Sequence, residues 1–342
     1  MLRDEQLRII KELRDHLKGD STAYAKGMMR APVDTFTCTD LLQKELDQFF
    51  KKEALLLGLS PDLPENNTYI ATSETGVPIL MTRDSDGRFR AFLNVCRHRG
   101  VQVIADGRGR KANFSCPFHS WTYRNTGDLI SVTKEERFGY IGKGDHGLVA
   151  LPAEEKYGML WVRPTPDGDP INVDAAMGGL GIEIENWDIA SHPYVEEQTL
   201  EANINWKLAI DTFGENYHFD FLHKGTLAPQ IYGNLQTSQA FDNNYRMVFA
   251  SKTNFDQIVE HMPEEEWPYR YMTLNVYFIY PNTIFLVDAI GLDLLRMYPD
   301  PKDPGKSKTH HRYYANPEMV NYLEKQREES GENHEPESRF VG

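Results

Sequence analysis

The sequence predicts an α+β protein of two domains, the first mostly β and the second built from a helix and another sheet. The chain has 342 residues, which exceeds the usual size of a single domain. Strand-like runs begin at residue 68, and a run with helical periodicity follows at 203–223 before further strand-like runs. The composition, 40% hydrophobic and 26% charged, is typical of an ordinary folded protein.

The chain starts with two predicted helices and then changes to the period of strands. A helical face recurs within residues 1–18, and a second short helix is predicted near 40–52. The apolar residues of the first face are Leu2, Ile9, Ile10, Leu13 and Leu17. From residue 68 the runs YIATSE, VPILMTRD and RFRAFLNVC predict three strands, with a turn at 84–87 between the last two.

A linker divides the chain after the strand-like runs WTYRNTGDLI and YGMLWVRP. The segment TPDGDP at 165–170 concentrates Pro, Gly and Asp. We therefore predict an N-terminal helical segment at 1–45, a β domain at 46–165 and a second domain at 166–342. In the second domain a helix over 203–223 is followed by YMTLNVYFIY and NTIFLVDAI, which predict strands of another sheet. The buried stripe of that helix is predicted to be Trp206, Ile210, Phe213 and Tyr217.

Charge and cysteine content exclude several kinds of partner and location. The formal net charge of −14 disfavours nucleic acid, because phosphate contacts need clustered Lys and Arg. The charged N-terminal segment lacks the apolar stretch of a signal peptide or membrane span, so we expect a cytoplasmic protein that does not enter a membrane. The three cysteines, Cys38, Cys96 and Cys116, are too few for a disulfide framework, so we expect thiols or metal ligands.

Two short loops each combine one cysteine with one histidine. CRHRG supplies Cys96 and His98, and CPFHSW supplies Cys116 and His119. Thiolate suits iron-sulfur clusters or zinc and imidazole suits iron and zinc alike, so ligand type alone leaves the metal open. Zinc loops usually pair like residues. The mixed loops instead match a [2Fe-2S] centre with two cysteines on one iron and two histidines on the other.

A second group of metal-ligand residues lies in the predicted helix at 203–223. Glu215 and His218 share a helix face at i and i+3. His218 and His223 are separated by a rotation of about 500° in a regular helix, which leaves their side chains about 140° apart. A distortion or a helix end is therefore expected here if both imidazoles bind one ion. A single histidine on a helix is more often structural than a ligand, so neither residue decides the question alone.

Both groups together resemble one family. The two mixed loops, with Pro117 inside the second and Trp121 and Tyr123 after it, resemble the Rieske domain of ring-hydroxylating oxygenases. The string Glu-x-x-His-x-x-x-x-His after Asn-Trp-Lys resembles the mononuclear iron helix of that family. The resemblance implies an all-β Rieske [2Fe-2S] domain at 46–165 and a helix-grip, START-like catalytic domain with an antiparallel sheet at 166–342. The segment 1–45 would pack on the catalytic domain.

The resemblance also implies which residues hold the metals. The [2Fe-2S] cluster would be bound by Cys96, His98, Cys116 and His119. His218 and His223 would be two limbs of a 2-His-1-carboxylate site for Fe(II). Glu215 would be the inter-subunit electron-transfer bridge, hydrogen-bonded between a Rieske histidine of a neighbouring subunit and the iron histidine. The family more often has Asp at that position.

The third iron ligand is where the resemblance ends. The family usually has adjacent Glu and Asp on a C-terminal helix, and no such stretch is found here. The chain ends at residue 342, close to where that helix would begin, so either the helix is missing from this sequence or the ligand is placed unusually. We leave the third ligand unassigned and prefer none of Asp288, Asp293, Glu332, Glu335 and Glu337.

The function implied by the resemblance is that of a terminal oxygenase. It would pass electrons through the cluster to the iron and activate O2 to hydroxylate, dihydroxylate or oxidatively demethylate a small organic substrate. The sequence has no Gly-x-Gly-x-x-Gly motif for a nicotinamide, so NAD(P)H would act through a separate ferredoxin and/or flavin reductase. The family forms head-to-tail trimers, and a homotrimer is expected.

Other functions and the nature of the substrate stay open at this point. A Rieske-type electron carrier without oxygenase activity and a zinc-stabilised ligand-binding protein are the alternatives. Both an aromatic ring and a methylated ammonium suit a pocket lined by aromatic residues. A basic cluster beside the first loop is the candidate docking site for an acidic electron donor. Its members are Arg97, Arg99, Arg108, Arg110 and Lys111.

Overall fold

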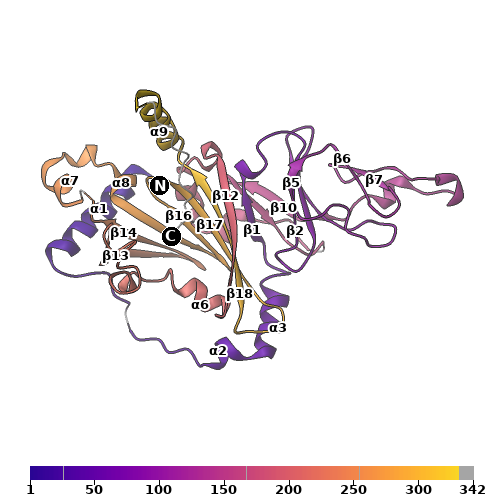
Figure 1. The fold of residues 1–342 in the computed structure, drawn as a ribbon. Helices are drawn as coiled ribbons and strands as arrows, with labels where there is room; N and C mark the ends of the chain where they lie inside the picture. Colours follow the sequence, from indigo (N-terminus) through magenta and orange to yellow (C-terminus); the bar gives the residue numbers. More distant parts are fainter. Residues whose placement is uncertain (26, 167, 254, 331–342) are drawn as a thin grey trace. The chain divides into compact units, whose positions relative to one another are not determined.

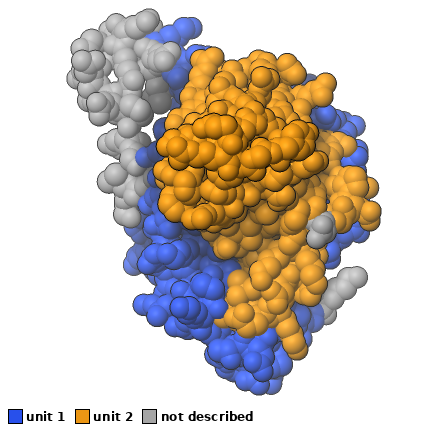
Figure 2. Space-filling view, turned by 90° about the vertical axis from the view of Figure 1, so that its right-hand side faces the viewer, with its two compact units in different colours: residues 1–41, 174–342 blue, residues 42–173 orange. Residues whose placement is uncertain are grey.

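The computed structural model describes residues 1–25, 27–166, 168–253 and 255–330. The chain divides into two compact units, which Figure 2 shows in blue and orange. Unit 1 joins residues 1–41 to 174–342, and unit 2 contains residues 42–173. Both units contain antiparallel sheets, and helices are concentrated in unit 1 (Figure 1). The predicted α+β class is confirmed.

Unit 2 contains three antiparallel sheets. The five-stranded sheet has the order β5 (Gly107–Arg110), β2 (Thr68–Thr72), β3 (Ile79–Arg83), β4 (Phe89–Leu93) and β9 (Ala150–Leu151). A three-stranded sheet has the order β1 (Leu55–Leu59), β11 (Met159–Val162) and β10 (Ala153–Lys156). The last sheet is formed by β6 (Asn113–Ser115), β7 (Thr122–Arg124) and β8 (Leu129–Ser131). Short 3₁₀ turns lie at Ser60–Asp62, Glu135–Arg137 and Lys143–His146.

The predicted turn at 84–87 is confirmed, and a buried carboxylate closes it. Oδ1 of Asp84 accepts the amides of Asp86 and Arg88, each at 2.9 Å, and Gly87 has φ +80°. Oδ2 of Asp84 accepts Nε of Arg90 at 2.6 Å. The backbone bonds and the guanidinium together lower the pKa of Asp84 even though burial opposes them. A charged side chain is therefore stable inside the hairpin, because two amides and a guanidinium donate hydrogen bonds to it.

Unit 1 is built on one antiparallel sheet of seven strands (Figure 1). Their order is β12 (Tyr194–Ala202), β18 (Ser307–Ala315), β17 (Gly291–Pro299), β16 (Thr283–Val287), β15 (Thr273–Ile279), β14 (Asn244–Ser251) and β13 (Ile231–Phe241). The predicted strands at 271–280 and 282–290 are β15 and β16. The sequence did not predict β17, because all nine of its residues are buried and its pattern lacks the alternation of a half-exposed strand.

The helices of unit 1 cover this sheet at several places. The longer helices are α1 (Arg3–Lys18), α7 (Phe255–His261) and α9 (Pro317–Ser330). Shorter ones are α2 (Asp34–Thr37), α4 (Val173–Met177), α5 (Leu180–Glu185), α6 (Trp206–Asp211) and α8 (Tyr269–Met272), while α3 (Thr39–Gln48) spans the division between the units. Helix α1 contacts β13 and α8, and α6 lies against β17 and β18. Within the described part of the chain, none of the helices is both long and apolar enough to span a bilayer.

The predicted continuous helix at 203–223 is wrong. Helix α6 ends at Asp211, and a separate 3₁₀ turn, η5, occupies Tyr217–Asp220. Asn205 begins α6 by accepting the amide of Lys207 at 2.9 Å. The chain then turns at Gly214, whose amide donates to the carbonyl of Asp211 at 2.9 Å. Glycine destabilises a helix at that point. The apolar residues keep their helical spacing across the break, so the spacing alone did not reveal where the helix ends.

Candidate metal centres and the adjoining pocket

The loops that carry the cysteine and histidine pairs in unit 2 have the same local geometry. The amide of Cys96 donates to the carbonyl of Val101, and the amide of Cys116 donates to the carbonyl of Trp121, each at 2.8 Å. In both loops the cysteine carbonyl accepts the amide four residues later, from Gly100 and Ser120. Those two residues have positive φ values of +74° and +58°. Each loop is thus a closed knuckle with the cysteine at its base.

Both cysteine side chains point into the core of unit 2. They belong to one apolar cluster with Phe92, Phe114 and Tyr123, and their exposed fractions are 3% and 2%. Neither forms a disulfide. Burial raises the pKa of the Cys116 thiol. A buried thiolate would therefore need a cation to compensate it, which is what a metal cluster provides.

The two histidines lie side by side nearer to the surface. The ring centroids of His98 and His119 are 4.6 Å apart, and Trp121 stacks on His98 at 4.9 Å with an interplanar angle of 6°. Nδ1 of His98 is buried and has no hydrogen-bond partner among the described residues. Burial and the neighbouring His119 lower the pKa of His98, which favours the neutral imidazole that metals bind. Two inner thiols and two outer imidazoles fit the divided ligand set of a Rieske cluster.

Tyr123 is a further member of this centre, which the sequence named only as a neighbour of the second loop. Its hydroxyl lies 3.2 Å from Sγ of Cys96 and accepts the amide of Arg97 at 3.0 Å. The phenol is fully buried and its oxygen already accepts the amide, so its hydroxyl is assigned as the donor to the sulfur. It lies 27 residues along the chain from Cys96, in strand β7, where it pairs with Phe114 of β6. Motif spacing alone could not have revealed this contact.

In unit 1, the chain segment after α6 brings the second group of predicted ligands together. Nδ1 of His218 donates to Oε1 of Glu215 at 2.5 Å, and the amide of His218 donates to Oε2 of the same carboxylate at 3.1 Å. The predicted pairing of these residues is therefore present, although a turn rather than a helix creates it. The carboxylate fixes the imidazole with Nε2 as its remaining ligand atom.

The break in the helix also brings the two histidines close. The ring centroids of His218 and His223 are 5.3 Å apart, with an interplanar angle of 59°. A single α-turn follows η5, in which the amide of Leu222 donates to the carbonyl of His218 and that of His223 to the carbonyl of Phe219. The predicted distortion between the two histidines is confirmed, because a regular helix would have pointed them in different directions.

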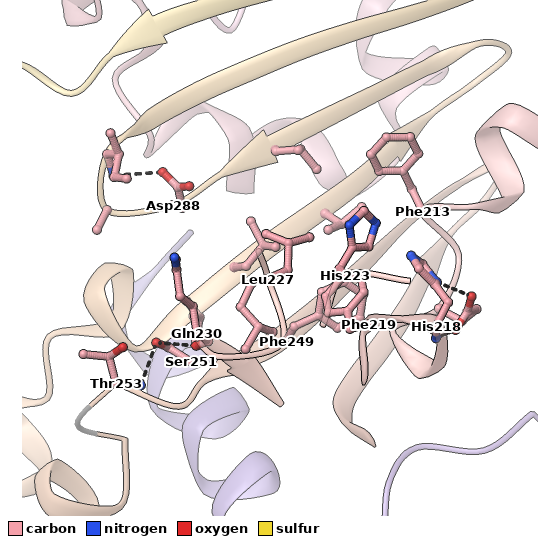
Figure 3. A pocket seen from close by; sticks show the side chains of 18 of the residues that line it. Phe213, His218, Phe219, His223, Leu227, Gln230, Phe249, Ser251, Thr253 and Asp288 are labelled. Atoms are coloured by element: carbon pink, nitrogen blue, oxygen red, sulfur yellow. Dashed lines mark hydrogen bonds and ion pairs between the residues drawn. The ribbon is translucent and has the colours of Figure 1, made fainter. Parts of the chain in front are cut away.

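Both histidines border a cavity of about 620 Å³ (Figure 3). This size is in the range of small-molecule sites. Its walls come from the segment after α6 and from β13 to β16, and they are mostly apolar. The apolar lining includes Phe213, Phe219, Leu222, Leu227, Ile231 and Phe249. The polar lining includes Glu215, Gln230, Ser251, Thr253, Arg270 and Asp288.

No described carboxylate completes a three-ligand site with the histidines. Asp288 lies across the cavity from His218 in Figure 3, and its Oδ1 accepts the amides of Ile290 and Gly291. Asp293 is bonded to Nε2 of His311 at 2.9 Å. No set of three His, Cys, Asp or Glu side chains that could hold one metal ion is found among the described residues. The other three acidic candidates, Glu332, Glu335 and Glu337, lie outside the described residues.

Comparison with family models assigns each unit. A model of the Rieske [2Fe-2S] domain matches residues 54–149, and a model of the ring hydroxylating alpha subunit (catalytic domain) matches residues 189–339. The chain belongs to the Rieske ring-hydroxylating oxygenase family. The family resemblance predicted from the sequence is confirmed, as are its two types of domain. Membership implies a Rieske cluster and a mononuclear iron as the cofactors.

Individual Rieske oxygenases agree with this assignment. The chain is 28% identical over 304 residues to chloroplastic choline monooxygenase from Amaranthus tricolor, covering 86% of this chain and 65% of the relative. It is 27% identical over 183 residues to the glycine betaine monooxygenase oxygenase subunit from Pseudomonas aeruginosa, covering 54% of this chain and 42% of the relative. The chain thus spans less than two thirds of either protein.

Solved structures of Rieske oxygenases share the fold. The quaternary ammonium Rieske monooxygenase CntA superposes with a TM-score of 0.72 at 20% identity, covering 86% of this chain and 79% of that chain. Naphthalene 1,2-dioxygenase from Rhodococcus sp. superposes with a TM-score of 0.71 at 19% identity, covering 96% and 81%. At these identities the likeness concerns the fold alone.

Proposed function

We propose that this chain is the oxygenase component of a Rieske non-haem iron mono- or dioxygenase. It would use electrons from a redox partner to activate O2 and hydroxylate, dihydroxylate or oxidatively demethylate a small organic substrate. The observation that carries the proposal is the presence of two separate ligand groups, one per unit, of which the second borders a cavity of about 620 Å³. The match to the catalytic-domain model favours this function over the electron-carrier and zinc alternatives.

Four residues of unit 2 would hold the cluster. Cys96 and Cys116 would bind the inner iron from the core, and His98 and His119 would bind the outer iron near the surface. The unpartnered Nδ1 of His98 and the buried thiols support this division. Trp121 would hold the His98 ring in place by stacking on it. When bound, such a cluster passes single electrons and leaves the oxidation of substrate to the second site.

Two residues of unit 1 would hold the mononuclear iron. His218 would offer Nε2, because Glu215 occupies its Nδ1, and His223 would be the second ligand. Two histidines and one carboxylate on Fe(II) leave coordination positions open for O2 and substrate. The apolar walls of the cavity would orient the substrate and exclude water from it. The carboxylate ligand stays unassigned.

Glu215 would also connect the two kinds of site between subunits. Its side chain is 45% exposed although it already bonds His218, so a second hydrogen-bond partner can reach it. In a head-to-tail homotrimer that partner would be a Rieske histidine of the next subunit. Assembly into a trimer would also cover exposed apolar side chains that lie near the Rieske histidines and near Glu215 in the sequence. They are Phe118, Phe138 and Tyr140 in unit 2 and Tyr217, Phe221 and Leu222 in unit 1.

A ferredoxin and/or a flavin reductase would supply electrons from NAD(P)H. The basic cluster proposed as its docking site is partly neutralised by ion pairs. Arg108 pairs with the buried Asp62 at 3.2 Å, and Arg110 pairs with Glu65 at 2.8 Å. The remaining members of the cluster are Arg97, Arg99 and Lys111, and they are therefore the better candidates for charge-steered docking. A cytoplasmic location, where thiols stay reduced, is part of the same proposal.

Metal analysis with a visible spectrum tests the proposal. We expect red-brown protein with about three irons per chain, two in the cluster and one between the histidines, and oxygen uptake after reduction. About two irons per chain without oxygen uptake would instead indicate an electron carrier. Colourless protein that contains zinc would contradict both.

A further inference from the structure

Arg270 is the one lysine or arginine among the described residues that line the cavity. It lies in the short helix α8, which precedes β15. Its guanidinium stacks over Trp187 at 5.9 Å, and its Nε donates to the carbonyl of Asp288 at 2.5 Å. A cation is thus part of a wall that is otherwise mostly apolar, and it comes from a different chain segment than the histidine pair.

The contacts of Arg270 fix the guanidinium and leave one end of it available. Nη2 lies 3.0 Å from Nε2 of His192 and 3.5 Å from the carbonyl of Gly291. Nδ1 of His192 donates to the carbonyl of Asp188 at 3.0 Å, so Nε2 is the acceptor for the arginine. The two N–H groups on Nη1 have no hydrogen bond among the described residues. All the acceptors are neutral groups.

The pKa values of Arg270 and His192 agree with a positive charge on Arg270 that its neighbours only partly compensate. Burial lowers the pKa of Arg270 by more than the nearby Asp288 and Glu318 raise it. Burial and the arginine charge also lower the pKa of His192 to about 4, so this imidazole is neutral near pH 7 and cannot repel the guanidinium. The carboxylate of Asp288 is directed to the amides of its own turn. An arginine stays protonated under these conditions, and its best partner is an oxyanion.

We propose that the cavity takes a small organic carboxylate with an apolar body, whose carboxylate pairs with Nη1 of Arg270. This inference rests on the proposed function of the cavity as the substrate site. Asp288, whose carbonyl holds the arginine, lies across the cavity from His218 (Figure 3). The carboxylate is therefore anchored away from the histidines, and the apolar body extends toward them between Phe213, Phe219 and Phe249.

His192 acts as a positioning residue in this arrangement. Its side chain is 2% exposed, and its Nε2 accepts a hydrogen bond from Nη2 of Arg270. This bond holds the plane of the guanidinium. Bidentate recognition of a carboxylate depends on that plane, which a lysine ammonium does not provide. Arg270→Lys is therefore expected to keep only part of the preference for carboxylates, and Arg270→Gln is expected to lose it.

The test measures binding of four probes to the iron-loaded protein by calorimetry, without turnover. Benzoate and benzamide share a body and differ in charge, as do glycine betaine and choline. For the pair whose body the cavity accepts, the carboxylate should bind about 10- to 100-fold more tightly. Arg270→Gln should bring that ratio to about one while leaving the affinity for the uncharged or carboxylate-free member within about threefold. The retained affinity shows that the pocket is still folded.

Lys252→Gln is the matched control. Lys252 lies between the lining residues Ser251 and Thr253, is not itself part of the lining, and donates to the carbonyl of Ala228 at 2.7 Å. Its loss removes the same charge and should leave the ratio unchanged. The inference is overturned if both members of each pair bind equally, if choline is preferred, or if Arg270→Gln weakens both members alike. It is also overturned if no probe binds to protein that holds its full iron, whereas an absent mononuclear iron would count against the proposed function itself.

Discussion

The loops around Cys96 and Cys116 are closed by hydrogen bonds within each loop, whereas the segment with His218 and His223 departs from the helix that its own sequence pattern predicts. The first proposed centre has all four candidate ligands on two short loops of one unit. The second has two ligands after a turn at Gly214, a carboxylate behind one of them, and no described third ligand. Electron-transfer sites gain from fixed geometry, and sites that bind O2 and substrate need open positions.

The two proposed centres also differ in how deeply their residues are buried. Cys96 and Cys116 are nearly inaccessible, while the side chains of Glu215 and His218 are 45% and 22% exposed. Substitution in the first centre should therefore damage the core of unit 2 as well as the cluster. Substitution in the second should change chemistry and leave the fold intact.

The largest effect is expected from Cys116→Ser. The buried thiol is part of the core and, in the proposed function, a cluster ligand, so the variant should lose its visible absorption and about two irons per chain. Iron analysis and a visible spectrum measure both. Cys38→Ser is the matched control: Cys38 is exposed, so its substitution should change neither the visible spectrum nor the iron content. Retention of full colour by Cys116→Ser would contradict the assignment.

His223→Ala should affect only the second centre. We expect the visible spectrum to persist, the iron content to fall by about one per chain, and oxygen uptake to fall by more than about 100-fold, the upper end for loss of an outer-shell partner. His261→Ala provides the control, since the side chain of His261 is 78% exposed and is not part of the cavity lining. Equal iron contents in both variants would show that His223 is not a ligand.

Glu215→Gln alters the residue that is proposed to connect the two centres, and it should have a smaller effect. The amide keeps the size of the side chain, so both metals should remain, but its loss of charge should slow electron transfer and substrate oxidation by about 10- to 100-fold. Rapid mixing of the reduced protein with O2 measures the transfer step. Asp220→Asn controls for the change in net charge, because Asp220 is exposed and lies at the end of η5. A normal transfer rate in Glu215→Gln would remove the proposed bridge.

Tyr123→Phe should have the smallest effect. It removes one hydrogen bond to Sγ of Cys96 without changing a ligand. Hydrogen bonds to sulfur help set cluster potentials. A bond of about 1 kcal/mol corresponds to a fall of about 40 mV for a one-electron couple. Protein-film voltammetry of the two proteins measures the difference, and an unchanged potential would show that the contact does not reach the cluster.

The sequence predicted the parts of the molecule that local patterns encode. The strands around the turn at Asp84 follow from period and turn residues, and the close approach of the loops that carry Cys96 to His119 agrees with their spacing. The need for a distortion between His218 and His223 followed from helix geometry, although the earlier end of the helix before Gly214 did not.

Contacts between distant segments could not be predicted in this way. Arg270 reaches His192 across 78 residues, and neither residue carries a local signal of a ligand site. The same is true of Tyr123 and Cys96, which are 27 residues apart in the chain and meet in the core of unit 2. Such sites depend on tertiary structure, and a single sequence gives no direct record of it.

The central claim is that electrons from the cluster in one unit are consumed at the histidine pair of the other. Its most direct test is the reoxidation of the reduced cluster by O2, followed in the visible spectrum in the presence of a bound carboxylate probe. The account predicts fast reoxidation in the native protein and a loss of that fast phase in His223→Ala, whose cluster is intact. Identical traces for the two proteins would contradict it.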